Sequence, residues 1–182
     1  MGYDALGPGL AGATKEVVMS FPIRAFVKST AEASPKGGLF YAGGNWWFRS
    51  EFIVPNGTRQ NILALTGPQS GSIGRADNSP GLTLAEGYSW ELRIKDPQDS
   101  AFSDGPRPGT IVVNDGGGIE FWGHIMGTPE HRHGFDVLGD QVPMYNEADG
   151  RPYLHYRSYE AWLLDENGNL VGGKPIFETV AA

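Results

Sequence analysis

The segment NWWFRSEFIV at residues 45–54, followed by PNGT at 55–58 and RQNILALT at 59–66, decides the fold class. In the first segment apolar and polar side chains alternate with a period of two, which is typical of a half-buried β-strand. The Asn-Gly pair that follows tolerates the positive φ angles of a tight turn, so the two flanking segments are predicted to form an antiparallel hairpin. One face of its first strand carries Trp46, Phe48, Phe52 and Val54.

The same alternation appears on both sides of this hairpin, in EGYSWELRIK at 86–95 and GIEFWGHIM at 118–126. The turn NDGGG at 114–118 is expected to join TIVV to the second of these strands, and DENGN at 165–169 to separate the last two strands. Three consecutive hairpins predict an antiparallel meander.

Three further segments are less regular. EVVMSFPIRAFV at 16–27 is a strand candidate that Pro22 interrupts, which indicates a sheet edge or a bulge. YLHYRSYEAWLLD at 153–165 also fits a helical stripe, but its four aromatic residues and the turn after it favour a strand. The stretch 96–109 is rich in Pro, Gly and Ser and is predicted to be an exposed loop.

About eight hairpin-linked strands and no convincing long helix predict an all-β fold. We expect a single antiparallel β-barrel over residues 16–182, lipocalin-like or calycin-like, because bulky aromatic residues line the apolar faces and an eight-stranded barrel can enclose one small ligand. A two-layer β-sandwich is the alternative. Residues 1–15 are expected to form a flexible leader that could act as a lid.

Composition narrows the classes of partner. The 27 glycines and 13 prolines exceed a fifth of the 182 residues, and aromatic residues make up 12%, which suits short strands and tight turns. A net charge of -7 without a basic cluster argues against nucleic acid and anionic membranes as partners. The start of the chain lacks the pattern of a secretory signal, so a cytoplasmic location is expected, and a homodimer is left open.

Few short motifs survive inspection. Gly7, Gly9 and Gly12 match the spacing of a dinucleotide loop, but no strand can precede them, so no nucleotide cofactor is predicted. With no cysteine in the chain, disulfides and thiolate chemistry are absent. His131 and His133 resemble the His-x-His of cupins, although the glutamate that should follow is missing. We expect these histidines on a polar loop and predict no metal or other cofactor, and a metal site that adds His124 is kept as an alternative.

Two sets of side chains could line a cavity, and periodicity does not decide between them. One set supplies acid or base candidates beside stacking surfaces, and for it we predict Glu120, His124 and Glu160 as catalytic residues. Both sets supply ligand-binding aromatics. The predicted ligand-binding residues of the first set are Trp122, Tyr156 and Trp162, and those of the second are Trp46, Phe48, Tyr88, Trp90 and Phe121.

The leader MGYDALGPGLAGATK, the strands GNWWFRSEF, GYSWELRI and IEFWGHIM, and the lack of a cofactor motif resemble, in outline, the lipocalin-like and dirigent-like barrel cyclases of bacterial polyketide pathways, including the spirotetronate Diels–Alder type. The resemblance implies a cofactor-independent cyclase or isomerase that encloses a hydrophobic, polyketide-like molecule in an aromatic cavity. An intramolecular (4+2) cycloaddition is one such reaction. There are two alternatives. The first is a non-catalytic module that binds either a small ligand or a carbohydrate, the carbohydrate being stacked on exposed Trp47 or Trp122. The second is a metal-dependent enzyme whose metal is bound by histidines.

Overall fold

A computed structural model describes residues 22–97, 100–103, 105–114, 116–144 and 153–179 of the chain. Within these ranges the fold is all-β, and the single helical element is a short 3-10 turn, so the all-β prediction is confirmed. The predicted leader lies outside the described residues. The elements are η1 (Ile23–Ala25), β1 (Phe26–Thr30), β2 (Leu39–Ala42), β3 (Asn45–Val54), β4 (Gly57–Ala64), β5 (Ser72–Arg75), β6 (Pro80–Leu84), β7 (Ser89–Ile94), β8 (Ser100–Ser103), β9 (Ile111–Val113), β10 (Ile119–Ile125), β11 (Thr128–Asp136), β12 (Tyr153–Tyr156), β13 (Tyr159–Leu164) and β14 (Phe177–Glu178).

The predicted central hairpin is present as β3 and β4, which pair antiparallel from Trp47 with Ala64 down to Val54 with Gly57. Gly57 has φ of 131°, a value that side chains rarely allow, and this explains the glycine at the end of the turn. β9 and β10 likewise pair across the 114–118 turn. The alternating segments therefore form strands where the sequence predicts them.

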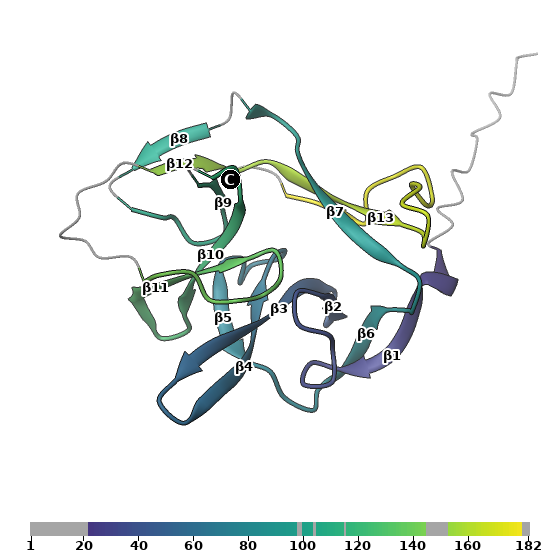
Figure 1. Ribbon diagram of the computed structural model, residues 1–182, viewed down its shortest axis with the longest axis horizontal. Helices are drawn as coiled ribbons and strands as arrows, with labels where there is room; N and C mark the ends of the chain where they lie inside the picture. Colours follow the sequence, from purple (N-terminus) through teal and green to yellow (C-terminus); the bar gives the residue numbers. More distant parts are fainter. Residues whose placement is uncertain (1–21, 98–99, 104, 115, 145–152, 180–182) are drawn as a thin grey trace, which may run out of the picture.

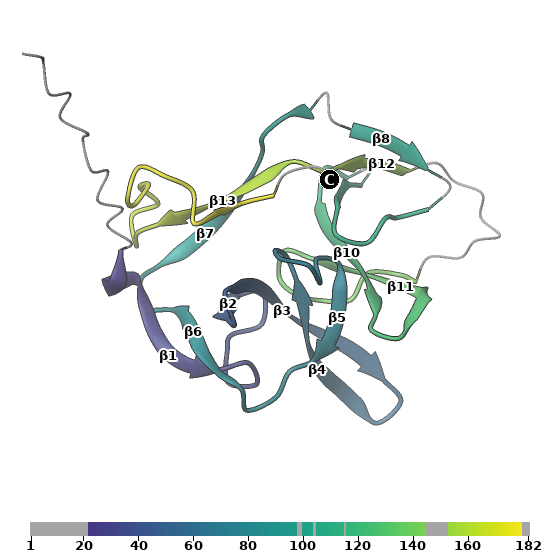
Figure 2. The same ribbon diagram turned by 180° about the vertical axis from the view of Figure 1, so that it is seen from behind.

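The strands form two sheets. Ten strands of the larger sheet follow the order β1-β6-β2-β3-β4-β5-β10-β9-β12-β8, and β11 pairs with β10 outside this path. A second sheet has the order β14-β13-β7. Figures 1 and 2 show the larger sheet curving around an interior, with β7 and β13 crossing over it.

The expected antiparallel barrel of about eight strands is corrected in two respects. β5 and β10 run parallel, pairing Ser72 with His124 and Ile73 with Ile125, so the larger sheet is mixed. Among the described strands the hydrogen-bonded path ends at β1 and β8 and does not close on itself. A strand count of eight was too low because short strands such as β8 and β14 carry little periodic signal.

Two local predictions are also corrected. β8 lies inside the stretch predicted to be an exposed loop, and it pairs with β12. The histidine-rich segment is strand β11 and not a polar loop, because it pairs with β10 and buries Phe135. In the 153–165 segment the strand reading is right and the helical one wrong, but two strands, β12 and β13, replace one.

One chain segment connects the two sheets. β12 belongs to the larger sheet and β13 to the smaller one, with only Arg157 and Ser158 between them. A strand that bends from one sheet into another forms a corner of the fold. Both sheets share one core as a result, and its buried residues are Leu39, Trp46, Phe48, Phe52, Leu63, Leu65, Ile73, Ile111, Phe121, Phe135, Tyr159, Ala161 and Phe177.

No helix among the described residues has the length and hydropathy needed to span a membrane.

Because this core is closely packed, the addition of a single methyl group is predicted to destabilise the fold. A Cβ at Gly123 would lie 2.4 Å from Leu63 Cδ1 and 2.8 Å from the Gly71 carbonyl oxygen, which accepts a hydrogen bond from the His124 amide. We expect Gly123→Ala to lower the free energy of unfolding by about 1–3 kcal/mol in urea titrations. Gly74→Ala is the control, because no atom lies within 4 Å of its Cβ position, and equal losses for the two variants would contradict the packing.

Candidate functional site

Eight aromatic rings from both sheets contact one another in the interior. Neighbouring ring centroids are 4.7 to 6.5 Å apart, the range in which aromatic pairs attract. We call this group the aromatic interior, and its members are Phe26, Tyr41, Trp46, Phe48, Trp90, Phe121, Tyr159 and Phe177. Four predicted ligand-binding residues, Trp46, Phe48, Trp90 and Phe121, belong to it.

The polar groups of the aromatic interior are neutral. Neither the Tyr159 hydroxyl nor the Trp46 indole N–H has a hydrogen-bond partner among the described residues, and the same holds for the buried Ser50 hydroxyl. Burial raises the pKa of Tyr159 well above its ordinary value, so the phenol keeps its proton.

A cleft opens beside the aromatic interior, and we call it the Trp90 cleft. Its volume is 500 Å³, and it lies between the loop before β2 and the turn that joins β6 to β7. The Trp90 indole N–H donates a hydrogen bond to the Gly37 carbonyl across the cleft, at 3.1 Å. The predicted ligand-binding residues Tyr88 and Trp90 both line it. The lining comprises residues 35–38, Thr83, Leu84, Ala85, Glu86, Tyr88, Ser89 and Trp90.

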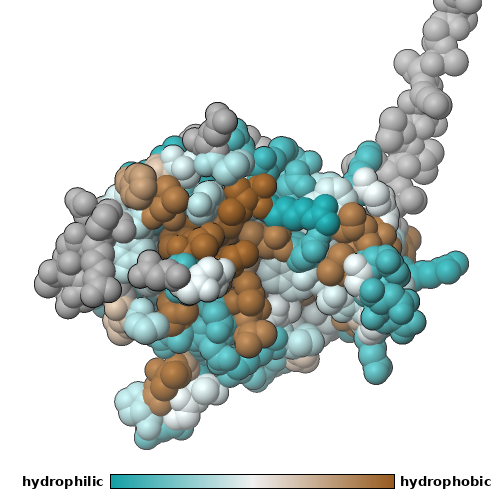
Figure 3. Space-filling model, turned by 45° about the horizontal axis from the view of Figure 1, so that its top comes forward, coloured by the Kyte–Doolittle hydropathy of each residue, from teal (hydrophilic) through white to brown (hydrophobic). Residues whose placement is uncertain are grey.

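A second hollow, which we call the outer groove, has a volume of 440 Å³. It lies on the face of β10 that carries Glu120 and Trp122, opposite to the face from which Phe121 enters the aromatic interior. Figure 3 shows apolar side chains gathered on this side of the molecule, over β8 and β12. Glu120 lies in the groove with its carboxylate held by Asn114 at 3.0 Å and by the Trp122 indole at 2.9 Å. Phe102, which is 70% exposed, and Tyr153 complete its aromatic lining.

The structure does not bring the three predicted catalytic residues together. Glu160 lies on the smaller sheet, opposite the buried face of Tyr159 and Ala161, and accepts a hydrogen bond from Trp162 at 2.6 Å. Glu120 and His124 both lie on β10 of the larger sheet. His124 is paired with Arg132 of β11 on one side and with Ser72 of the parallel strand β5 on the other. No hydrogen bond or ion pair among the described residues joins these three side chains.

The predicted aromatic partners are also separated. Trp162 is covered by the Arg93 guanidinium, 4.9 Å from its ring, while Tyr156 packs against the core. Trp122 is 2% exposed, and Trp47 is half-buried against a small cluster of buried side chains. Trp122 is therefore nearly covered, and Trp47 keeps part of its surface exposed.

The histidines of β11 do not form a metal site with His124. His133 packs on Phe52, with ring centroids 4.6 Å apart, and burial lowers its pKa. His131 is exposed. Among the residues that the structure describes, no three His, Asp or Glu side chains converge on a point that could hold a metal ion.

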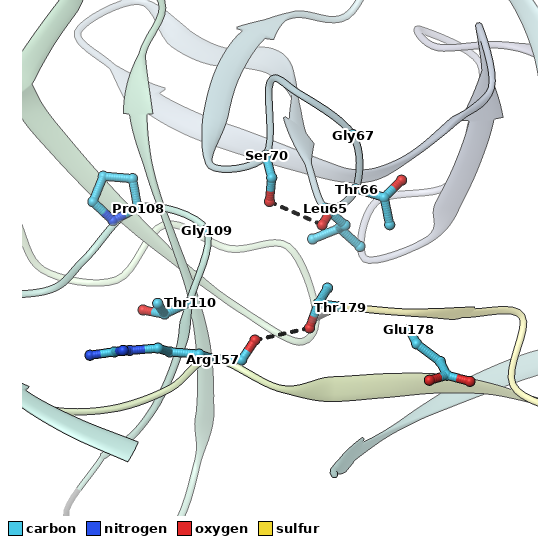
Figure 4. Close-up of a pocket in the computed structure, with 10 residues that line it drawn as sticks. All are labelled: Leu65, Thr66, Gly67, Ser70, Pro108, Gly109, Thr110, Arg157, Glu178 and Thr179. Carbon is cyan, nitrogen blue, oxygen red and sulfur yellow. Dashed lines mark hydrogen bonds between the residues drawn. The ribbon is translucent and has the colours of Figure 1, made fainter. Parts of the chain in front are cut away.

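A third cavity, which we call the vestibule, lies where the two sheets meet and has a volume of 370 Å³ (Figure 4). It was not predicted from the sequence. Four hydroxyl groups and two charged groups line it. Figure 4 shows the Arg157 guanidinium near Thr110 and the Glu178 carboxylate at the opposite end. The lining residues are Leu65, Thr66, Gly67, Ser70, Pro108, Gly109, Thr110, Arg157, Glu178 and Thr179.

His155, which is fully buried behind the vestibule, also escaped the sequence analysis. Its Nδ1 accepts a hydrogen bond from the Arg107 amide at 3.2 Å, so the ring proton lies on Nε2 and can be donated to the Gly105 carbonyl at 2.9 Å. Ser103 Oγ is also 2.9 Å from Nε2. Because the Ser103 hydroxyl donates to the Gly105 carbonyl and Nε2 carries the proton, this serine and histidine hold a loop and do not form a nucleophile–base pair.

The bend of the chain at Arg157 and Ser158 explains why the sequence does not predict the vestibule and His155. An unbroken strand would place Tyr156, Glu160 and Trp162 on one face. In the structure the bend shifts the alternation, so Tyr156 and Tyr159 both pack on the core. The Tyr-Arg-Ser-Tyr sequence carries no Pro or Gly to indicate the break.

Comparison of the chain with protein-family models, with curated proteins and with solved structures found no match.

His155 predicts how stability depends on pH. Burial, together with nearby arginines, lowers its pKa from 6.5 to about 4. The folded protein therefore binds this proton less tightly than the unfolded chain. The contribution of His155 to the free energy of unfolding is fully present above pH 6.5 and is lost as the pH falls through 4, by about 3 kcal/mol at pH 4.

Urea titrations between pH 7 and 4 of the wild type and of His155→Gln test this dependence. The variant is expected to be less stable at pH 7 and to lose less stability on acidification. Parallel pH curves for the wild type and His155→Gln would show that His155 does not carry the effect.

Proposed function

We propose that the protein binds a hydrophobic small molecule between the Trp90 cleft and the aromatic interior, and that it catalyses cyclisation or isomerisation of this molecule without a cofactor. The observation that carries the proposal is the position of Trp90. Its indole lines the cleft and also lies 6.0 Å from the rings of Phe48 and Phe121 in the interior. A ligand in the cleft is therefore one side chain away from the core.

The size and lining of the cleft support a ligand of this kind. Small-molecule pockets usually measure roughly 300–1,000 Å³ and are mainly apolar, with a few polar groups that orient the ligand. The cleft, at 500 Å³, is within this range, and Pro35, Leu84, Ala85 and Tyr88 supply apolar surface. Burial of ligand surface here contributes about 25 cal/mol for each Å² of apolar area.

In this proposal the two sheets together enclose the ligand, as the wall of a closed β-barrel would. The larger sheet curves around the interior and the smaller sheet crosses it, with Tyr159 and Phe177 of β13 and β14 touching rings of the larger sheet. Side chains of the two sheets, and not a continuous hydrogen-bond ladder, would then close the cavity around the ligand.

The side chains of the interior favour chemistry that depends on confinement. The Tyr159 phenol and the Trp46 indole are neutral donors that can polarise a carbonyl group, and no acid–base pair of described side chains accompanies them. In an intramolecular (4+2) cycloaddition a diene and an alkene exchange two π bonds for two σ bonds, and no atom or proton leaves. Holding the two ends together can lower the barrier by about 7–11 kcal/mol.

Binding of the neutral probe N-phenyl-1-naphthylamine, followed by fluorescence, tests the cleft. We expect Ala85→Trp, which fills the cleft, to weaken binding at least tenfold, and Tyr88→Ala to weaken it severalfold because apolar contact is lost. Tyr153→Ala, at the outer groove, is the matched control and should bind like the wild type. Thermal unfolding of each variant verifies that it is folded.

Catalysis is tested with a linear trienone in which a diene is tethered to an enone. The wild type is expected to accelerate disappearance of the diene absorbance over buffer, and Ala85→Trp to abolish the acceleration. Probe binding without any acceleration would favour the non-catalytic binding protein over the cyclase. Unchanged probe binding by Ala85→Trp would refute the location of the site.

The outer groove supports a second candidate, a carbohydrate-binding role. The Glu120 carboxylate is oriented by two hydrogen bonds and can accept hydroxyl protons, while Phe102 and Tyr153 can stack on a sugar ring. Soluble glycans that bind the wild type, lose affinity in Phe102→Ala and retain it in Tyr88→Ala would favour this role.

A further inference from the structure

The vestibule contains a positive charge that the described residues leave uncompensated. Glu178 lines the cavity but forms an ion pair with Lys95, which satisfies its carboxylate. Arg157 lines the same cavity and has no ion-pair partner among the described residues. A half-buried arginine without a carboxylate partner is unexpected in a chain whose net charge is -7.

Three of the four hydroxyl groups that line the vestibule have already donated their protons. Thr110 Oγ1 donates to the Arg107 carbonyl at 2.7 Å, and Ser70 Oγ donates to the Leu65 carbonyl at 3.1 Å. Thr179 Oγ1 donates to the Arg157 carbonyl at 3.0 Å (Figure 4). Since a hydroxyl has one hydrogen, these three groups are left as acceptors. Thr66 Oγ1 accepts from the Trp46 amide at 2.8 Å and keeps its proton, so the Arg157 guanidinium is the charged donor that a ligand would meet and the Thr66 hydroxyl a neutral one.

The surroundings of His155 indicate that the local potential is positive. Burial is the main cause that lowers the pKa of His155, and Arg107, Arg157 and Arg132 lower it further, with no carboxylate of the described residues acting appreciably in the opposite direction. The imidazole lies beside the vestibule, with Nδ1 2.9 Å from the hydroxyl oxygen of the lining residue Thr110. An anion in the vestibule would therefore meet a favourable field.

We propose that the vestibule binds a carboxylate, with the Arg157 guanidinium as its partner, and that the hydrophobic ligand of the interior is a carboxylic acid whose acid group lies there. The second part rests on the proposed function. Tyr159 connects the two places, because its amide donates to Thr179 Oγ1 of the vestibule while its ring packs on Phe121.

A carboxylate fits the vestibule better than a phosphate does. The planar guanidinium fork matches a carboxylate through two parallel hydrogen bonds. Phosphate sites commonly rely on several backbone N–H groups or on a helix N-terminus, and the described residues form no α-helix here. The hydroxyl oxygens that face the cavity would repel the additional charge of a phosphate.

Titrations of the full-length protein with octanoate, octanol and inorganic phosphate, followed by amide NMR shifts, test the proposal. Octanoate is expected to shift the amides of residues 65–67, 70, 109–110 and 178–179. Arg157→Gln should weaken octanoate binding at least tenfold and leave octanol binding unchanged. Arg93→Gln is the control, because this arginine pairs with Glu91 on the outer face of the smaller sheet and should bind octanoate like the wild type.

The outcomes separate this inference from the proposed function. Equal octanoate affinity in Arg157→Gln and the wild type, or phosphate binding as tight as octanoate binding, would overturn the carboxylate site. Octanoate binding that depends on Arg157 but is unaffected by Ala85→Trp would establish the carboxylate site and refute its link to the interior ligand. Loss of N-phenyl-1-naphthylamine binding in Ala85→Trp tests the proposed function alone.

Discussion

The contact of Phe48 with rings from both sheets is the interaction on which the rest of the fold depends. Phe48 is fully buried on β3. Its ring centroid lies 4.7 Å from that of Phe121 in the larger sheet and 6.0 Å from that of Trp90 in the smaller sheet. Since the hydrogen-bond ladders of the described strands do not join the two sheets, side-chain contacts of this kind hold them over one core. The cavities then lie around this aromatic centre, where strands end and loops begin.

Local features of the fold could be predicted from the sequence, but long-range pairing could not. The hairpin of β3 and β4 follows from alternation and an Asn-Gly turn, both of which act over a few residues. The parallel pairing of Ser72 with His124 joins segments far apart in the chain, and no local pattern encodes it. β8 is four residues long and was read as loop because two periods of alternation do not stand out from a polar background.

For the candidate site, the sequence predicts two sets of side chains that could line a cavity but does not decide between them. Trp46, Phe48, Trp90 and Phe121 lie in the interior, whereas Glu120 and Glu160 lie on outer faces of separate sheets and Tyr156 packs on the core. Both glutamates belong to a Glu-x-Trp pattern in which residues two apart share a face of the strand, and in both the indole N–H binds the carboxylate. This repeated pairing was a readable sign that each glutamate is satisfied locally. His155 and Arg157 could not be found in this way, because the groups that hydrogen-bond them come from the β8–β9 loop and from Thr179, which follows β14.

The hydrogen bond from Trp90 to the Gly37 carbonyl also has a kinetic consequence. Trp90 is anchored in a strand, but Gly37 belongs to a short loop in which it adopts a φ of 73° that other residues avoid. A single neutral hydrogen bond contributes about 1 kcal/mol net. The loop is also held to β3, because the Gly37 amide donates to the Arg49 carbonyl at 2.8 Å and the Arg49 amide donates to the Gly38 carbonyl at 2.9 Å. If the proposed ligand lies behind Trp90, its rate of exchange would depend on how often these contacts open together.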